Sequence, residues 1–232
     1  MLSISEATGG YKKVTIIKNA SISVGEGEIV ALLGRNGVGK TTLIKYAMGL
    51  IDSFGGTVSL QGEILPKSTS KRVKMGLGYV PQGRFVFPRM SVPENIAVAA
   101  IACGHDWKAA VAQSFVDFPI LEEKKSALAG SLSGGQQQIL AIARALATKP
   151  KVLILDEPTE GVQPSIIDEI AGILKRLNEE RGLSIIVAEQ DLDFCLSLAE
   201  RAYVIDGGTI AQETTKQELL QNKTLLHELL GV

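Results

Sequence analysis

Apolar residues occur along this chain in short runs separated by longer stretches of mixed character. Residues 29–33, 152–155 and 183–187 are almost entirely apolar. A strand with apolar side chains on both faces is typical of the interior of a parallel sheet that helices cover. Helices are expected after two of these runs, over residues 42–48 and 164–179. The alternation predicts an α/β fold that binds its ligands at the carboxyl ends of strands.

Weaker patterns occupy the rest of the chain. Short β-like segments are expected over residues 14–17, 21–24, 57–61 and 78–80. The Gly-containing stretch 52–56 reads as a turn that leads into the third of these segments. From Pro88 to about Thr148 the pattern becomes helical, which indicates a helical lobe inserted into the α/β core.

A glycine-rich loop follows the first apolar run. Residues 34–41 read Gly-Arg-Asn-Gly-Val-Gly-Lys-Thr, which fits the phosphate-binding pattern G-x-x-x-x-G-K-[ST]. Backbone N–H groups of such a loop point at phosphate oxygens, Lys40 supplies a positive charge, and the Thr41 hydroxyl can hold Mg²⁺. The positive end of the following helix faces the same anion. The residues expected here to bind ATP are Gly34, Arg35, Asn36, Gly37, Val38, Gly39, Lys40, Thr41 and Thr42.

A second segment narrows the class of protein. Leu132, Ser133, Gly134, Gly135 and Gln136 precede a helix expected over residues 136–147. Ser-Gly-Gly at a helix start can hold an anion, although alone it could equally be a simple helix cap. Together with the phosphate-binding loop, this signature segment resembles that of the ATP-binding-cassette (ABC) ATPases over essentially the whole chain. In that family the signature of one subunit closes over ATP held by another.

Two adjacent carboxylates, Asp156 and Glu157, end the buried run 152–155. Carboxylates there are costly to bury unless a cation or hydrogen bonds compensate them. We expect Asp156 to hold Mg²⁺ through water and Glu157 to polarise the attacking water. The family resemblance agrees, because residues 155–159 match its Walker B segment with the catalytic glutamate.

The resemblance also implies roles for two isolated residues. Gln82 follows the expected strand 78–80, where the family has a glutamine that contacts Mg²⁺ and the attacking water. The expected Mg²⁺ set is therefore Thr41, Gln82 and Asp156. Tyr11 stands where the family stacks an aromatic ring on adenine, although a tyrosine packed at a strand edge is also a reasonable interpretation.

The chain departs from the common family pattern at two positions. Gln190 takes the place of a histidine that contacts the γ-phosphate, and it can donate a hydrogen bond but cannot carry a positive charge. We expect a catalytic role for Gln190; the alternative is that it caps a helix over residues 191–199. Gln163 replaces an aspartate that meets the opposite subunit. Both departures also occur in ATPases of the branched-chain amino acid and amide uptake group.

The detailed resemblance is to the second ATPase subunit of bacterial urea importers. It rests on residues 34–40, 80–84, 87–89, 132–138 and 157–165. The implied function is an ATPase subunit that powers import of urea or a short amide, with a branched-chain amino acid importer as the alternative. A soluble ABC ATPase outside transport is a further alternative, although such proteins usually carry two cassettes or a long coiled coil. A P-loop kinase is disfavoured by the signature segment.

The resemblance implies an architecture as well as partners. We expect one ABC ATPase domain over residues 1–232, with a RecA-like core lobe of residues 1–87 and 149–232 that includes an N-terminal antiparallel β subdomain, and a helical lobe of residues 88–148. The expected partners are a second ATPase subunit, identical or different, two transmembrane permease subunits and, indirectly, a periplasmic or lipid-anchored solute-binding protein. Residues 84–88, with Phe85 and Phe87, are the expected docking surface for the permeases.

Composition adds few constraints. The net charge of −1 gives no reason to expect nucleic acid as a partner. Two cysteines without metal-ligand spacing fit a reducing compartment. No apolar run approaches the roughly 18 residues needed to span a bilayer, and the start of the chain does not resemble a signal peptide. We therefore expect a cytoplasmic protein attached peripherally to the inner face of the cell membrane.

Overall fold

A computed structural model describes residues 1–221 of the chain. The strands are β1 (Leu2–Tyr11), β2 (Val14–Val24), β3 (Ile29–Leu33), β4 (Asp52–Leu60), β5 (Glu63–Ile64), β6 (Leu77–Val80), β7 (Val152–Asp156), β8 (Ser184–Glu189), β9 (Arg201–Asp206) and β10 (Thr209–Thr215). The helices are α1 (Lys40–Met48), α2 (Thr69–Met75), α3 (Val92–Ala102), α4 (Trp107–Asp117), α5 (Pro119–Glu123), the 3₁₀ helix η1 (Ala129–Ser131), α6 (Gly134–Leu146), α7 (Pro164–Arg181), α8 (Leu192–Leu198) and α9 (Lys216–Gln221).

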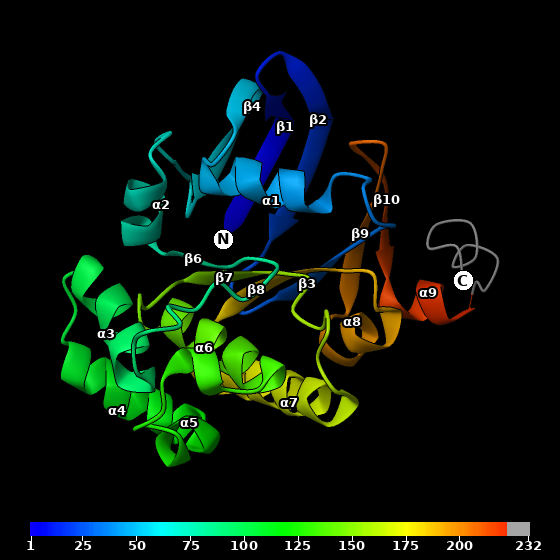
Figure 1. The fold of residues 1–232 in the computed structure, drawn as a ribbon. Coiled ribbons are helices and arrows are strands. Elements are labelled where there is room, and N and C mark those ends of the chain that lie inside the picture. The colour runs from blue at the N-terminus through cyan, green and yellow to red at the C-terminus, as the bar shows by residue number, and fades with distance from the viewer. Residues whose placement is uncertain (222–232) are drawn as a thin grey trace.

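The strands form two sheets with helix α1 between them (Figure 1). One sheet is antiparallel, in the order β2-β1-β4-β5. The other has the order β10-β9-β3-β8-β7-β6 and is parallel except at β10. The expected α/β fold with an antiparallel β subdomain is confirmed.

The three apolar runs are interior strands of the parallel sheet, as their composition predicts. Successive residues of β3 pack on opposite sides of this sheet. Ile29, Ala31 and Leu33 join the core formed with helices α3 to α8. Val30 and Leu32 join the core formed with α1 and the antiparallel sheet. Both faces of the strand are therefore removed from water, which explains why it lacks the usual polar alternation.

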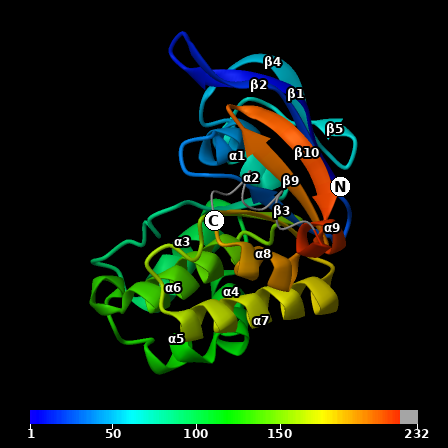
Figure 2. The same ribbon diagram turned by 90° about the vertical axis from the view of Figure 1, so that its right-hand side faces the viewer.

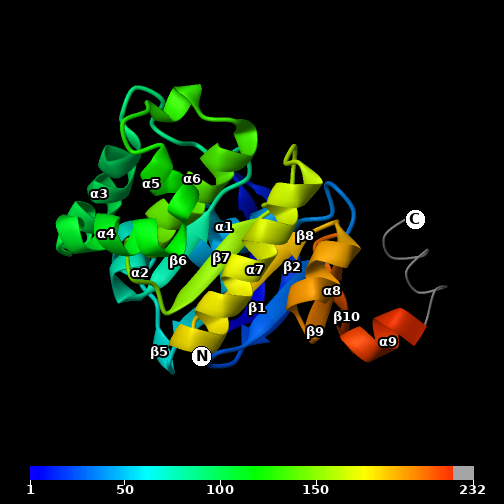
Figure 3. The same ribbon diagram turned by 90° about the horizontal axis from the view of Figure 1, so that it is seen from below.

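Helices α3 to α6 gather at one end of the parallel sheet, while α7 and α8 cover the face opposite to α1 (Figure 3). Figure 2 shows the antiparallel sheet on one side of the molecule and these helices on the other. The helical segment expected after Pro88 is observed as α3, α4, α5, η1 and α6. No helix within residues 1–221 combines the length and apolar character that a membrane span requires.

Two sequence interpretations in the antiparallel sheet are wrong. The segments 14–17 and 21–24 are one strand, β2, which continues past Asn19 with φ of 53° and shifts its register with β1. The expected turn 52–56 lies inside β4. A Cβ on Gly56 would be 2.5 Å from the carbonyl oxygens of Ser5 and Glu6, so glycine there permits the close approach of β4 to β1. Glycine marks an irregular strand here, not a turn.

Candidate functional site

The glycine-rich loop joins β3 to α1 at the carboxyl end of the parallel sheet. Gly37 and Gly39 have φ values of 80° and 119°, and Gly39 occupies the N-cap position of α1. Arg35, Asn36 and Gly37 are exposed, whereas Val38 is half-buried and packs against the core beside α1. Thr41 and Thr42 lie half-buried in the first turn of the helix. The loop therefore has the strand, turn and helix start that a phosphate-binding loop needs.

Lys40 lies behind this loop, with only 3% of its surface exposed. Its ammonium donates to the carbonyl oxygens of Gly34, at 2.7 Å, and Arg35, at 3.2 Å. A third contact, of 3.2 Å, reaches Oε1 of Glu157. The buried cation thus has both backbone and carboxylate partners, which offset the cost of removing it from water.

Asp156 is the last residue of β7 and lies beside the first turn of α1. The Thr41 hydroxyl donates to its Oδ1 over 2.9 Å, and the Tyr79 hydroxyl donates to its Oδ2 over 3.2 Å. Burial raises the pKa of Asp156, and the two hydrogen bonds act in the opposite direction. Tyr79 was not among the predicted residues, because a tyrosine within a short strand carries no local sign of such a contact.

The donors at this point fit Mg²⁺. The Thr41 hydroxyl and the Asp156 carboxylate are adjacent hard oxygen donors. Among residues 1–221 there is no cluster of three or more His, Cys, Asp or Glu side chains that could hold a metal ion. Magnesium at nucleotide sites needs only one or two protein oxygens, since phosphates and water complete its shell. The predicted Mg²⁺ roles of Thr41, Gln82 and Asp156 stay predictions.

Glu157 and Gln82 meet across the site. The Gln82 amide donates to Oε2 of Glu157 over 2.9 Å and to Oε2 of Glu160 over 3.0 Å. Glu157 adopts a φ of 48°, and its N–H donates to the carbonyl oxygen of Ala188 over 2.9 Å. This backbone conformation is uncommon for a residue with a side chain and is typical of functional sites. The structure thus brings Glu157, which is expected to polarise the attacking water, together with Gln82, for which the family resemblance implies a contact with the same water.

Arg84, in the loop after β6, contacts the loop after β7 and the start of α6. Its guanidinium donates to the carbonyl oxygens of Glu160, at 3.0 Å, and Gly161, at 2.9 Å. It also lies against the signature segment, since a Cβ on Gly134 would be only 2.7 Å from its Nη1. The loop after β6, the loop after β7 and the start of α6 therefore share one side chain. Sequence reasoning placed Arg84 only in a docking surface and missed this contact.

The two aromatic residues after Arg84 remain accessible. Phe85 is 68% exposed and Phe87 is 45% exposed. Arg144 of α6 holds this stretch, because it donates to the carbonyl oxygen of Phe85 over 2.8 Å and lies over the Phe87 ring. A fixed backbone with exposed aromatic rings is compatible with the predicted docking surface, which nonetheless stays a prediction.

The signature segment begins α6. Ser133 is the N-cap residue, and it exchanges hydrogen bonds with Gln136 in a capping box. Leu132 is buried, while Ser133 is exposed and Gly134 and Gly135 form the first helical positions. Within the chain the segment is therefore a well-formed helix start. Its binding to ATP of a partner subunit stays a prediction.

Gln190 and Tyr11 lie at exposed positions. Gln190 follows β8 and is exposed, whereas Asp191 is the residue that caps α8, accepting from the N–H of Phe194 over 3.0 Å. The alternative in which Gln190 caps this helix is therefore wrong. Tyr11 ends β1 and is 45% exposed. The catalytic role of Gln190 and the adenine-stacking role of Tyr11 stay predictions.

Glu189 is a buried carboxylate that sequence reasoning passed over. Its Oε1 accepts from the Thr159 hydroxyl and N–H, and its Oε2 accepts from the N–H groups of Gln190 and Asp191. Only 3% of Glu189 is exposed. A glutamate at the end of an apolar strand was the available sign, since an acid is rarely buried there without partners.

The fold and this site together define an ATP-binding cassette. Residues 17–160 match the model of the ABC transporter family, so the chain belongs to that family. It is thus an ATP-hydrolysing cassette and an ATP-binding subunit of the ABC transporter type.

Curated relatives match it from end to end. The high-affinity branched-chain amino acid transport ATP-binding protein BraG of Pseudomonas aeruginosa is 39% identical, with 100% of both chains covered. The probable branched-chain amino acid transport ATP-binding protein LivF of Archaeoglobus fulgidus is 33% identical, with 100% of this chain and 99% of the relative covered.

Solved structures agree with the fold. A dimeric ATP-binding cassette in a post-hydrolysis state, bound to ADP and phosphate, superposes with a TM-score of 0.83 at 26% identity. The match covers 93% of this chain and 99% of that one. CbiO1 from Clostridium perfringens, part of an ABC transporter complex, gives a TM-score of 0.84 at 27% identity, covering 98% and 93%.

Proposed function

We propose that the chain is the ATPase subunit of an importer for branched-chain amino acids. The carrying observation is the 39% identity with BraG over the full length of both proteins, and the similarity to LivF supports it. In this proposal the chain is cytoplasmic and lies peripherally on the inner face of the membrane. It drives two permease subunits, which receive the solute from a solute-binding protein.

Residues 34–42 bind the phosphates of ATP, and Lys40 supplies charge to the outer phosphates. Glu157 accepts a hydrogen bond from Gln82, so a carboxylate and an amide converge where a water molecule would be activated. Thr41 and Asp156, with Gln82, are the residues that would hold Mg²⁺, which neutralises developing charge on phosphate oxygens. Gln190 offers an amide donor for the γ-phosphate, and Tyr11 an aromatic face for adenine.

A second subunit completes the site. The glycine-rich loop of one chain already provides backbone donors and Lys40 for its own ATP, so the signature segment is available to the ATP of a partner. Ser133 is exposed at the start of the 13-residue helix α6, where backbone N–H groups attract anions. The partner is either an identical chain or a different ATPase.

Urea or a short amide is the second candidate solute. Residues 81–84 and 160–164 read Pro-Gln-Gly-Arg and Glu-Gly-Val-Gln-Pro, as in the urea importers that the chain resembles. These segments contact each other through Arg84 and Gly161 rather than a solute. The full-length relatives favour the branched-chain amino acid candidate.

Uptake measurements discriminate between the two solutes. In a strain that lacks the gene, we expect loss of energy-dependent uptake of labelled leucine, with urea uptake unchanged. Wild-type protein should restore leucine uptake, whereas the Glu157→Gln variant, expressed at the same level, should not. Selective loss of urea uptake would establish the second candidate, and unchanged uptake of both solutes would reject an import function for either.

A further inference from the structure

A cavity of about 670 Å³ lies at the amino-terminal edge of the parallel sheet. Its lining includes Glu26, Lys151 and Leu183, which precede β3, β7 and β8 respectively. The glycine-rich loop and Glu157 lie at the opposite, carboxyl edge of the same sheet. The cavity is therefore separate from the nucleotide site.

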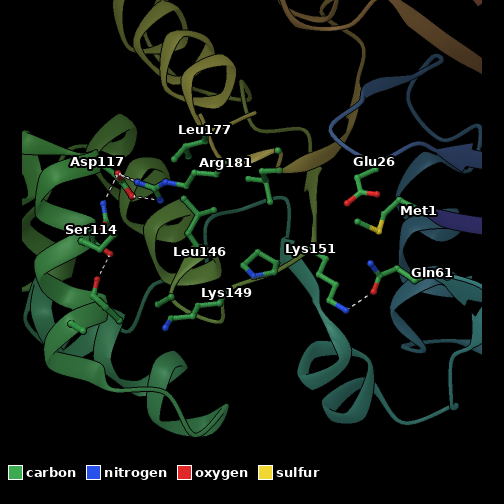
Figure 4. A pocket seen from close by; sticks show the side chains of 17 residues that line it. Met1, Glu26, Gln61, Ser114, Asp117, Leu146, Lys149, Lys151, Leu177 and Arg181 are labelled. Atoms are coloured by element: carbon green, nitrogen blue, oxygen red, sulfur yellow. Dashed lines mark hydrogen bonds and ion pairs between the residues drawn. The ribbon is translucent and has the colours of Figure 1, made fainter. Parts of the chain in front are cut away.

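Helical and sheet elements form different walls of this cavity (Figure 4). One wall comes from α4 and from the end of α6, including Leu146. The other comes from the start of the chain and the β4–β5 turn, including Met1 and Gln61. A molecule bound there would contact both parts of the fold at once.

The floor of the cavity is largely apolar. Ala110, Ala147, Leu177 and Leu183 line it, and each is less than 10% exposed. The Ser114 hydroxyl donates to the carbonyl oxygen of Ala110, so its proton is already satisfied. Such a floor favours an apolar group over a fully hydrated ion such as inorganic phosphate.

The rim has an excess of positive charge. Asp117 is neutralised by Arg181, as the dashed lines between them indicate (Figure 4). Lys151 contacts the neutral amide of Gln61, and within residues 1–221 neither Lys149 nor Lys151 forms an ion pair. Glu26 is the remaining carboxylate among the lining residues. The rim therefore favours an anion.

Lys149 also has an unusual backbone. It follows α6 with a φ of 52°, and its N–H donates to the carbonyl oxygen of Leu146 over 2.8 Å. Glycine or asparagine is favoured in this left-handed position after a helix. Within residues 1–221 no hydrogen bond or ion pair holds the Lys149 ammonium, so this lysine of the cavity lining is available to a ligand.

The geometry points to a binding site for a small organic carboxylate with an apolar body. The apolar body would lie on the floor formed by Ala147, Leu177 and Leu183. The carboxylate would lie at the rim, which Lys149 and Lys151 make positive. A neutral apolar molecule would not pair with the positive charge of the lysines. A small hydrophilic anion would not bury apolar surface on the floor.

Calorimetric titration of the whole protein with 4-phenylbutyrate tests the site, with 4-phenylbutyramide as a neutral probe of the same shape. We expect saturable binding of the carboxylate and at least tenfold weaker binding of the amide. The double variant Lys149→Asn/Lys151→Gln should bind the carboxylate at least tenfold more weakly. Lys125→Gln, which changes an exposed lysine away from the cavity, should bind it as the wild type does.

The melting temperature separates a binding role from a structural one. Asparagine accepts the left-handed conformation, so Lys149→Asn alone should leave the melting temperature unchanged or raise it. If the double variant does not fold, Lys151→Gln provides the same comparison of the two probes. Equal binding of carboxylate and amide, undiminished binding by a folded lysine variant, or no saturable binding at millimolar concentration would each overturn the inference.

Discussion

Glu189 and Thr159, thirty residues apart, are joined by two hydrogen bonds at the carboxyl edge of the parallel sheet. The Thr159 hydroxyl donates over 2.6 Å and its N–H over 2.9 Å to the same carboxylate oxygen. The other oxygen holds the N–H of Gln190 over 2.9 Å. One buried carboxylate therefore ties the loop that follows Glu157 to the loop that carries Gln190.

We expect Glu189→Gln to lower the maximal ATPase rate about tenfold or more, with little change in KM. An amide has one acceptor oxygen and cannot hold both loops, and small displacements of reacting groups are costly. Thr159→Ser should keep the rate because it keeps the hydroxyl, while Thr159→Val should lower it. Steady-state measurement of the maximal ATPase rate and KM, normalised to the concentration of folded protein, checks these expectations. A wild-type rate in Glu189→Gln would make the contact purely structural.

Glu157→Gln should abolish steady-state hydrolysis while ATP still binds. The reason is that the carboxylate is expected to act on water, not on the nucleotide. Lys40→Ala should instead weaken ATP binding, because it removes the buried ammonium from the predicted phosphate site. Phosphate release and nucleotide titration measure the two effects. Turnover at the wild-type rate in Glu157→Gln would contradict the assignment.

Gln190→Ala should lower the maximal rate by on the order of ten- to a thousandfold, more than it weakens ATP binding. This is the range for removing one positioned donor near developing charge. Gln190→His should retain activity, since an imidazole N–H can donate from a similar place. The assays require the membrane subunits. An unchanged rate in Gln190→Ala would remove Gln190 from the catalytic set.

ATP should promote dimerisation, most visibly in Glu157→Gln with Mg²⁺ limited. Closure of the signature segment over the ATP of a partner buries phosphate charge against helix α6, and slow hydrolysis preserves that state. Light scattering with and without ATP measures the mass. A monomer at saturating ATP would count against a homodimer, and mixing with a second ATPase would then test a heterodimer.

Glu28 should stabilise the fold at neutral pH. It accepts two hydrogen bonds from Arg201, over 2.7 and 2.9 Å, and these contacts lower its pKa from the ordinary 4.5. A lowered pKa gives stability that is present above the ordinary value and is lost as pH falls through the lowered value. Glu28→Gln should cost about 1–2 kcal/mol at pH 7.

Urea denaturation across pH 7 to 3 measures this contribution. The difference between wild type and Glu28→Gln should shrink on acidification. Glu122→Gln, at an exposed position, should differ little from wild type throughout. If the difference in unfolding free energy between wild type and Glu28→Gln does not depend on pH, the variant is destabilised by a poorer fit of the amide and not by the loss of the carboxylate charge.

Local sequence signals predicted the parts of the fold that are covered on both sides. β3 and β7 are strands whose residues face two cores, so composition alone identifies them. β1 and β4 have one mostly exposed face, and Gly56 mimics a turn signal although it serves a close strand approach. Their pairing depends on partners that are distant in the chain, which a local pattern does not contain.

The candidate site likewise has a part that local sequence predicts and a part that depends on contacts between distant residues. The glycine-rich loop is continuous in sequence, and its shape follows from the residues themselves. The contacts of Tyr79 with Asp156, and of Arg84 with Gly161, join residues 77 positions apart in each case. They arise only after β6 and β7 are paired in register, so no local spacing predicts them.

The Lys40 ammonium has three N–H groups, and it has three acceptors: two backbone carbonyls and Glu157. A phosphate oxygen can therefore contact this ammonium only by exchange with a partner already present. The net gain in affinity from Lys40 is the difference between the two sets of contacts, not the strength of the new one. If Glu157 is the partner that gives way, the arrival of ATP itself frees the carboxylate that is predicted to polarise water, and nucleotide binding would then prepare this predicted base for hydrolysis.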